Sequence, residues 1–203
     1  MTVLDRLILL LTGLVAVYIS WRFYGRYQHK KARYDIYYML GFIVLFVSGV
    51  LLIIFGYGIL SSPYVLTVAT LIPLGISMGL VHQFLPEYKK AYSWFALVGL
   101  LAIAFTSISG SSLKSLAVPL FHGIAGLIIF LLPILKVKSV KGFWWVGVGG
   151  ALIGLGGIAL AFIASGKQLL FFSPTFVFAI LAPLLLLMAL AFTWGFMKDI
   201  KHG

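Results

Sequence analysis

The sequence predicts an all-α integral membrane protein that crosses the bilayer seven times. Hydrophobic residues make up 63% of the 203 residues and charged residues only 9%, and the mean hydropathy is +1.15. Soluble globular domains carry about 25% charged residues, so this composition excludes that class. Several stretches without charge reach about 20 residues, the length that an α-helix needs to cross the hydrocarbon core of a bilayer.

Seven stretches of this kind can be read along the chain, each about 18 to 25 residues long. Short polar or basic segments separate them, which are in chain order GRYQHKKARYD, SSP, EYKK, SGSS, KVKSVK and SGKQ. The expected spans are residues 3–24, 36–60, 64–86, 92–110, 113–135, 143–165 and 172–197.

The basic residues predict how the chain is oriented. Twelve Lys and Arg residues lie around the ends of the first, third, fifth and seventh spans, whereas only Arg6, Lys114 and Lys167 lie on the opposite side. The positive-inside rule therefore places the N-terminus outside and the C-terminus in the cytoplasm of a multi-pass cell-membrane protein. The Trp residues all lie at the cytoplasmic ends of spans, where such rings anchor helices at the headgroup level: Trp21, Trp94, Trp144, Trp145 and Trp194.

Composition also bounds the partners and the chemistry. The basic residues that give the net charge of +11 lie between apolar spans, so the expected partner is the lipid bilayer and not a nucleic acid. The absence of Cys excludes disulfides and thiolate metal sites, and the absence of Asn together with Cys favours a thermophilic source. The first apolar run is too long for a cleaved signal peptide and no excess of basic residues precedes it, so we expect it to stay in the protein.

The first and last three spans share a collinear pattern. Ser62-Pro63 is followed by Pro73-Leu74 in the third span, and Ser173-Pro174 is followed by Pro183-Leu184 in the seventh. Both segments read S-P, eight or nine residues, then P-L-x-x-x-M-x-L. Matching pairs upstream keep an offset of about 106 to 111 residues. We therefore predict a single transmembrane domain, with parallel three-helix repeats over 1–90 and 113–203 and a linker helix over 91–112.

This 3+1+3 arrangement of seven helices resembles the superfamily of SWEET sugar facilitators, PnuC-type vitamin transporters and microbial opsins. The resemblance covers the whole chain in topology and internal repeat and rests on no family motif. SWEET proteins carry prolines in the first two helices of each repeat, and spans 1, 2 and 6 have none here. Opsins hold retinal on a Lys of the last helix, and residues 172–197 contain no Lys.

Two histidines lie within spans, His82 in the third and His122 in the fifth. An imidazole in a membrane can bind haem or a metal, shuttle protons, or hydrogen-bond to a neighbouring helix. Because the expected depths of the two residues differ by about 14 Å, they are not expected to be the two axial ligands of one haem. A structural hydrogen bond is the favoured role for each, and haem bound through one of them is an alternative.

The sequence offers little material for catalysis or ion coupling. All four acidic residues, Asp5, Asp35, Glu87 and Asp199, are expected near span ends or in loops. A proton relay or a sodium site needs ionisable groups within the membrane, so we expect neither. No metal site, nucleophile–base pair or phosphate-binding loop is visible, so enzyme activity has little support.

A ligand inside the bundle would have to use the few polar side chains within the spans. The candidate ligand-binding residues are His122, His82, Thr70, Ser77 and Gln83. They are too few for sugar recognition, which needs many paired donors and acceptors, so a small, weakly polar ligand is expected. Three prolines interrupt spans and are candidate hinges: Pro73, Pro119 and Pro183.

The sixth span carries small residues at alternating spacings of three and four. This seam consists of Gly147, Gly150, Gly154, Gly157, Ala161 and Ala164. Such spacing places small residues on one helix face, where another helix can approach closely. The partner helix is expected to belong to the same bundle, to a second copy of the chain or to another membrane protein.

The leading hypothesis is a non-catalytic facilitator or carrier for a small, weakly polar solute, which moves about the paired prolines. It predicts a polar cavity between the repeats, near His122, Thr70 and Pro183. The first alternative is a membrane sensor or an accessory subunit of a membrane complex, which should be filled in the centre and expose a groove of small residues. A weaker alternative is an electron-transfer subunit that binds haem b or quinone.

Overall fold

The computed structural model describes residues 1–137, 140–164 and 173–202, which are almost entirely helical. Its elements are α1 (Val3–Lys30), α2 (Arg33–Phe55), the 3-10 helix η1 (Tyr57–Ser61), α3 (Pro63–Ala69), α4 (Leu71–Phe84), the 3-10 helix η2 (Pro86–Tyr88), α5 (Lys89–Ile108), α6 (Lys114–Leu135), α7 (Trp144–Ala164) and α8 (Pro174–His202). Counting α3 and α4 as one, six helical stretches of the described residues are long and apolar enough to cross a membrane. With α7 as the seventh helix, this confirms the predicted all-α fold and is compatible with a multi-pass membrane protein.

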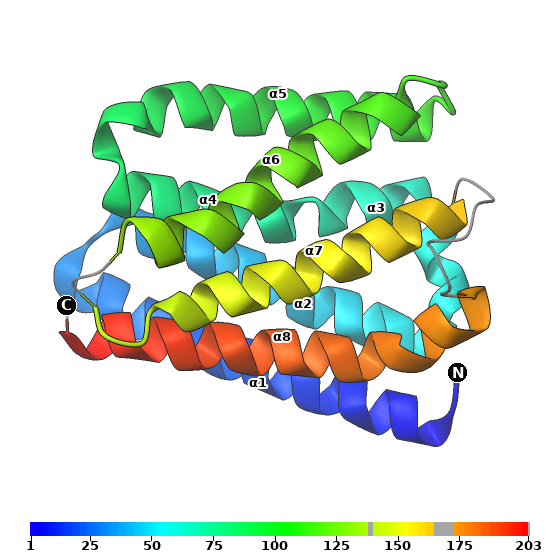
Figure 1. Cartoon of the computed structure of the whole chain (residues 1–203), viewed down its shortest axis with the longest axis horizontal. Coiled ribbons are helices and arrows are strands. Elements are labelled where there is room, and N and C mark those ends of the chain that lie inside the picture. The colour runs from blue at the N-terminus through cyan, green and yellow to red at the C-terminus, as the bar shows by residue number, and fades with distance from the viewer. Residues whose placement is uncertain (138–139, 165–172, 203) are drawn as a thin grey trace.

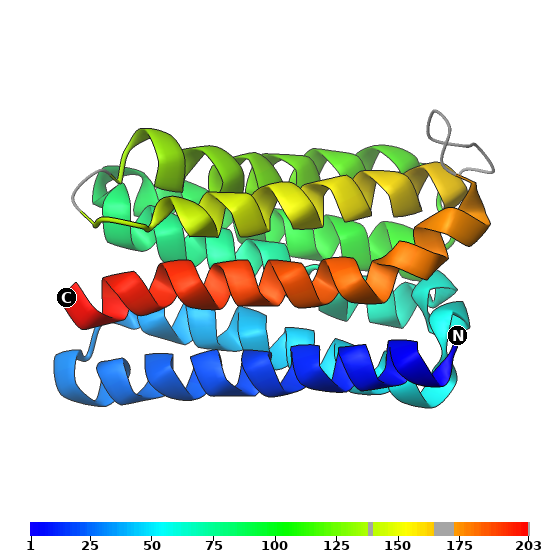
Figure 2. The same cartoon turned by 60° about the horizontal axis from the view of Figure 1, so that its bottom comes forward.

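The helices lie along one common axis (Figures 1 and 2). Six of them pack as a ring in chain order, α1, α2, α4, α6, α7 and α8, and α8 closes the ring against α1. Helix α5 lies outside this ring and packs against α3, α4 and α6. We call the end that holds the α1–α2 connection, η2, the α6–α7 connection and the C-terminus the basic end (left in Figure 1).

Most of the basic segment that the sequence predicts between the first two spans is helical. Helix α1 continues to Lys30, and α2 already begins at Arg33. Lys31 ends α1 in the left-handed conformation, with φ 55°, so the chain reverses within two residues. At the other end of α1, Asp5 and Thr2 form a capping box, in which each side chain accepts a hydrogen bond from the other's backbone N–H.

The second and third spans also end differently from the prediction. Helix α2 stops at Gly56, whose φ of 69° is easily adopted only by glycine, so residues 57–61 form η1 and not the end of the span. The third span is broken at Thr70 into α3 and α4. Pro73 lies in the first turn of α4, where its missing N–H costs little.

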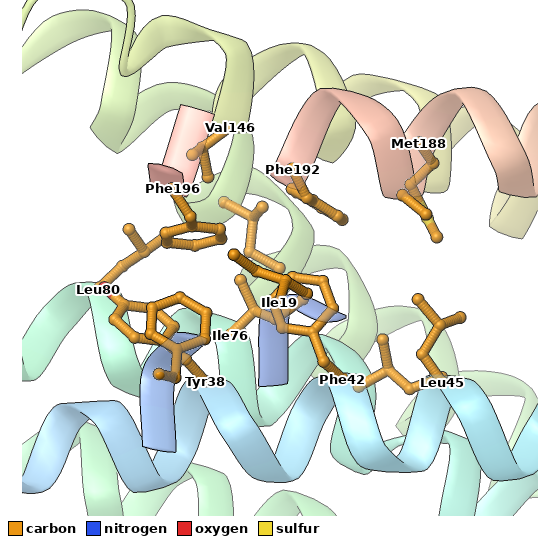
Figure 3. Packing of buried hydrophobic residues seen from close by; sticks show 14 of the residues in the cluster. Ile19, Tyr38, Phe42, Leu45, Ile76, Leu80, Val146, Met188, Phe192 and Phe196 are labelled. Atoms are coloured by element: carbon orange, nitrogen blue, oxygen red, sulfur yellow. The ribbon is translucent and has the colours of Figure 1, made fainter. Parts of the chain in front are cut away.

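Large apolar side chains fill the interior of the helix ring, between its centre and the basic end. Six buried rings form what we call the aromatic layer: Phe23, Tyr38, Phe42, Phe143, Phe192 and Phe196. The centroid of the Phe196 ring lies 4.7 Å from that of Tyr38 and 5.2 Å from that of Phe23. Figure 3 shows Phe196 and Phe192 of α8 facing Tyr38 and Phe42 of α2. Aromatic rings bury large apolar areas, so this layer ties α1, α2 and α8 together.

Glycines permit the closest approach of the helices. An added Cβ at Gly75 of α4 would lie 2.9 Å from the Tyr37 carbonyl oxygen of α2, and one at Gly150 of α7 would lie 2.8 Å from the Phe130 backbone nitrogen of α6. Gly147 is equally close to α6. Further along the predicted seam, Gly154 and Gly157 have no atom within 4 Å of an added Cβ, and the side chain of Ala161 lies outside the described residues.

The contrast between two glycines of α7 gives a matched test. Gly150→Val would press a branched side chain against the α6 backbone, and such overpacking typically costs about 1–3 kcal/mol. Gly154→Val makes the same chemical change in open space, so its effect should be small. Thermal unfolding of both variants in detergent, followed by tryptophan fluorescence, should show a clearly lower midpoint for Gly150→Val only. Equal midpoints would contradict the close α6–α7 packing.

Candidate functional site

Three charged side chains from three helices meet inside the basic end. Arg26 of α1, Asp35 of α2 and Asp199 of α8 are 6%, 0% and 4% exposed. The Arg26 Nε donates to Asp35 Oδ1 at 2.8 Å, and the terminal nitrogens of Arg26 form ion pairs with Asp35 and Asp199. We call these three residues the ion cluster. Burying charges in an apolar bundle costs desolvation free energy, so a buried group of charged residues is a candidate functional site.

The local fold explains why Arg26 and Asp35 meet. Since α1 runs to Lys30 and reverses within two residues, Arg26 and Asp35 lie at nearly the same level on adjacent antiparallel helices. Helix α8 lies beside α1 and runs in the same direction (Figure 2). Its last turns therefore bring Asp199 to the other side of the guanidinium.

Hydrogen bonds extend the ion cluster to a fourth helix. The Tyr38 hydroxyl donates to Gln83 Oε1 at 2.9 Å, and the Gln83 Nε2 donates to both Asp199 oxygens at 2.9 and 3.0 Å. The guanidinium carbon of Arg26 also lies 5.4 Å from the Phe23 ring centroid and 5.3 Å from that of Tyr34. The ion cluster thus holds α1, α2, α4 and α8 together, directly beside the aromatic layer.

The ion cluster contains two carboxylates and one guanidinium, so its charges do not balance. Only the Oδ1 oxygen of Asp35 accepts hydrogen bonds from Arg26. Its Oδ2 oxygen is buried and has no hydrogen-bond partner among the described residues. A buried acceptor without a partner costs about 1–3 kcal/mol. This half of the Asp35 carboxylate is therefore the part of the cluster that a proton or a water molecule would stabilise most.

The candidate ligand-binding residues do not converge on one cavity. Gln83 belongs to the network just described, whereas His82, the preceding residue of α4, pairs with Ser93 of α5. Ser77 donates to the Pro73 carbonyl oxygen and accepts from Tyr92. Thr70 donates to the Leu66 carbonyl oxygen at the α3–α4 break. The hydroxyl protons of both residues are therefore used within their own helices.

His122 lies on α6, apart from the other candidates. Its Nδ1 is buried and has no hydrogen-bond partner among the described residues. The candidate hinges occupy three different helices: Pro119 lies inside α6, Pro73 in the first turn of α4, and Pro183 inside α8. Helix α8 bends in its N-terminal part (orange in Figure 2), and a proline is a usual cause of such bends.

Two surface hollows accompany the bundle. One, the α2–α5 pocket, has a volume of about 440 Å³ and includes Arg33, Tyr37, His82, Lys89, Lys90 and Trp94 in its lining. The other is an apolar groove of about 450 Å³ between α7 and α8, which includes Trp145, Leu152, Leu187 and Trp194. Neither hollow is lined by Thr70, His122 or Pro183.

Sequence reasoning missed the ion cluster because it placed Asp35 and Asp199 near span ends or in loops and counted Arg26 only as an orientation signal. The signal was nevertheless present. On α1 the buried face continues at spacings of four and three from Ile19 through Phe23 to Arg26, and on α8 it continues from Phe196 to Asp199. A charged residue in register with an apolar face is a candidate for burial.

Comparisons with family models, curated proteins and solved structures find no match for this chain. Its function therefore has to be inferred from the geometry described above.

Proposed function

We propose that the protein is a non-catalytic membrane carrier or facilitator for a small, weakly polar solute, and that the ion cluster helps to close the basic end of its bundle. The observation that carries the proposal is the position of the cluster. Arg26 and Asp35 belong to the first helices of the ring, and Asp199 belongs to the last. The cluster thus crosses the junction at which α8 closes the ring against α1.

The chemistry of this junction suits a barrier that opens. Water can replace the partners of an ion pair or a hydrogen bond, whereas it offers no favourable interaction that offsets the free-energy cost of exposing an aromatic ring. Salt bridges and amide contacts at the basic end can therefore exchange with water, while the aromatic layer beside them excludes it. A closed conformation would look as described here, with Phe196 and Tyr38 in contact and Asp199 paired.

The order of the ring supports two moving halves. Helices α1, α2 and α4 contact one another in sequence, as do α6, α7 and α8, and the halves meet at the α4–α6 and α8–α1 junctions. Such an order is compatible with the 3+1+3 arrangement, in which two three-helix units rock around a site between them. Pro73 near the α3–α4 break and Pro183 in α8 then serve as hinges in corresponding helices.

The hydrogen bonds of the candidate residues argue for a weakly polar solute. The Thr70 and Ser77 hydroxyls donate hydrogen bonds to carbonyl oxygens of their own helices. They remain available only as acceptors, so a sugar with many hydroxyl groups would leave much of its polar surface unpaired, which is costly. A small solute with one or two donors loses less on entering.

Osmotic swelling of proteoliposomes tests the proposal. Liposomes that contain the protein should swell faster than empty ones in at least one solute of a panel such as urea, glycerol and erythritol, as followed by light scattering. In Asp199→Asn the new side chain can still accept a hydrogen bond from the Gln83 amide, but the ion pair with Arg26 is lost. The basic end should therefore open more often, and the swelling rate should rise severalfold. Glu87→Gln, which neutralises an exposed acid at the same end, is the matched control.

Swelling at the rate of empty liposomes for every solute, in both the unaltered protein and Asp199→Asn, would overturn the carrier function. Size-exclusion chromatography and circular dichroism would establish that the variant is folded. That outcome would favour the alternative of an accessory subunit, in agreement with the open space beside Gly154 and Gly157.

A further inference from the structure

The lining of the α2–α5 pocket contains no residue of the ion cluster or of the aromatic layer. It is formed where the first turn of α2, the end of α4 and the first turns of α5 meet. Three cations line it, Arg33 from α2 and Lys89 and Lys90 from α5, and its described lining residues include no Asp or Glu. None of the three cations takes part in the ion pairs of the described residues, which are those of Arg26.

These cations lie at the N-termini of helices, where the helix dipole disfavours positive charge. Arg33 is the first residue of α2, and Lys89 and Lys90 are the first two residues of α5. The N-terminus of a helix carries a partial positive charge, which favours anions and disfavours cations. Two positive helix ends and three cations therefore surround one hollow. We therefore expect a positive potential inside it, and an anion is the ligand that would relieve the repulsion between the cations.

A hydrogen-bonded wall fixes the shape of the pocket. The Ser93 hydroxyl donates to the Lys89 carbonyl oxygen at 2.7 Å, so its oxygen is left to accept from His82. The His82 Nε2, which lies 2.9 Å from the Ser93 oxygen, therefore carries the proton. The Tyr37 ring stands at 67° to the His82 ring, with centroids 4.8 Å apart. The pocket is thus built from side chains that hold one another in place.

The surroundings of the pocket indicate the source of the anion. Trp94 lines the pocket and is 67% exposed, and exposed Trp residues at the ends of membrane helices lie at the headgroup level. Arg33 begins one of the stretches that are apolar enough to cross a membrane, and Lys89 lies in the first turn of another, Pro86–Ile108. An anionic group at this depth belongs most naturally to a phospholipid.

We propose that the α2–α5 pocket binds the phosphate headgroup of an anionic membrane phospholipid, held by Arg33, Lys89 and Lys90. Its volume of about 440 Å³ lies within the range of small-molecule sites. The site does not depend on the carrier function, because none of its cations belongs to the ion cluster or to the aromatic layer.

Lipid titration of the full-length protein in detergent tests this site. Native mass spectrometry counts the bound lipids during titration with phosphatidylglycerol, which is anionic, or phosphatidylcholine, which is zwitterionic. Arg33→Gln/Lys89→Gln/Lys90→Gln is the pocket variant. Lys136→Gln/Lys141→Gln/Lys201→Gln removes the same charge from exposed positions at the same end and is the matched control.

The unaltered protein and the control should bind phosphatidylglycerol more tightly than phosphatidylcholine, and the pocket variant should bind phosphatidylglycerol about 100-fold more weakly. Equal weakening in both variants would reduce the effect to general surface charge and overturn the site. Equal binding of the two lipids by the unaltered protein would do the same. Displacement of the lipid by inorganic phosphate at an equal concentration would identify a free phosphate, and not a headgroup, as the ligand.

Discussion

Arg26→Met is expected to lower the free energy of unfolding by about 3–5 kcal/mol. The substitution retains an apolar side chain of similar length but leaves Asp35 and Asp199 buried without a cation. Two carboxylates in an apolar bundle cannot both stay charged, so the protein must either open or take up protons. Thermal or denaturant unfolding in detergent should show a large decrease relative to Arg6→Met, in which the same change affects an exposed Arg of α1.

A compensating variant separates buried charge from lost packing. Arg26→Met/Asp35→Leu/Asp199→Leu removes all three charges, and a fully apolar replacement of a buried ion cluster is often neutral or stabilising. It should therefore recover most of the stability that Arg26→Met loses. If the triple variant is less stable than the single one, the packing of these side chains matters more than their charges. Equal stability of Arg26→Met and Arg6→Met would show that the cluster contributes nothing.

Phe196→Ala should produce a loss of similar size, about 3–5 kcal/mol, through a different mechanism. The Phe196 ring is fully buried and lies within 6.3 Å, centroid to centroid, of five other rings of the aromatic layer. Its removal leaves a cavity that rings from α1, α2 and α8 cannot all move to fill. Unfolding midpoints in detergent would measure the loss.

Phe105→Ala is the control for this cavity. Phe105 is 72% exposed on α5, so its truncation removes little internal packing and should change the midpoint only slightly. If the two alanine variants unfold at the same temperature, the aromatic layer does not hold α8 against α1 and α2. The carrier proposal would then lose its closed barrier.

The fold class and the helices could be predicted from the sequence, because long apolar stretches have few alternatives in a membrane protein. Span ends were less predictable. The charges around Arg26 and Asp35 predict a segment between two spans, whereas the apolar periodicity through Ile19, Phe23 and Arg26 predicts that the helix continues. The helix that forms instead follows from residues that are neither Gly nor Pro between Arg26 and Asp35, and from a neighbouring helix that supplies Asp199 as a partner.

The candidate site was less accessible than the fold. The sequence indicated which polar residues lie within spans, but it contains no information on which helix each of them faces. His82 and Gln83 are adjacent in the chain, yet one pairs with Ser93 of α5 and the other with Asp199 of α8. Only the packing order of the helices decides such partners, and that order depends on contacts between residues far apart in the sequence.

The α1–α2 reversal has a consequence for how the protein is made. Arg26 and Asp35 are nine residues apart, whereas Arg26 and Asp199 are separated by 173 residues. During synthesis the first pair can form as soon as the α1–α2 hairpin leaves the ribosome, so Asp35 can neutralise the charge of Arg26 long before Asp199 is made. Asp199 is synthesised only after α1 to α7. Packing of α8 against α1 is therefore the step that completes the cluster, and before that step the face of α1 that α8 covers remains without its partner helix.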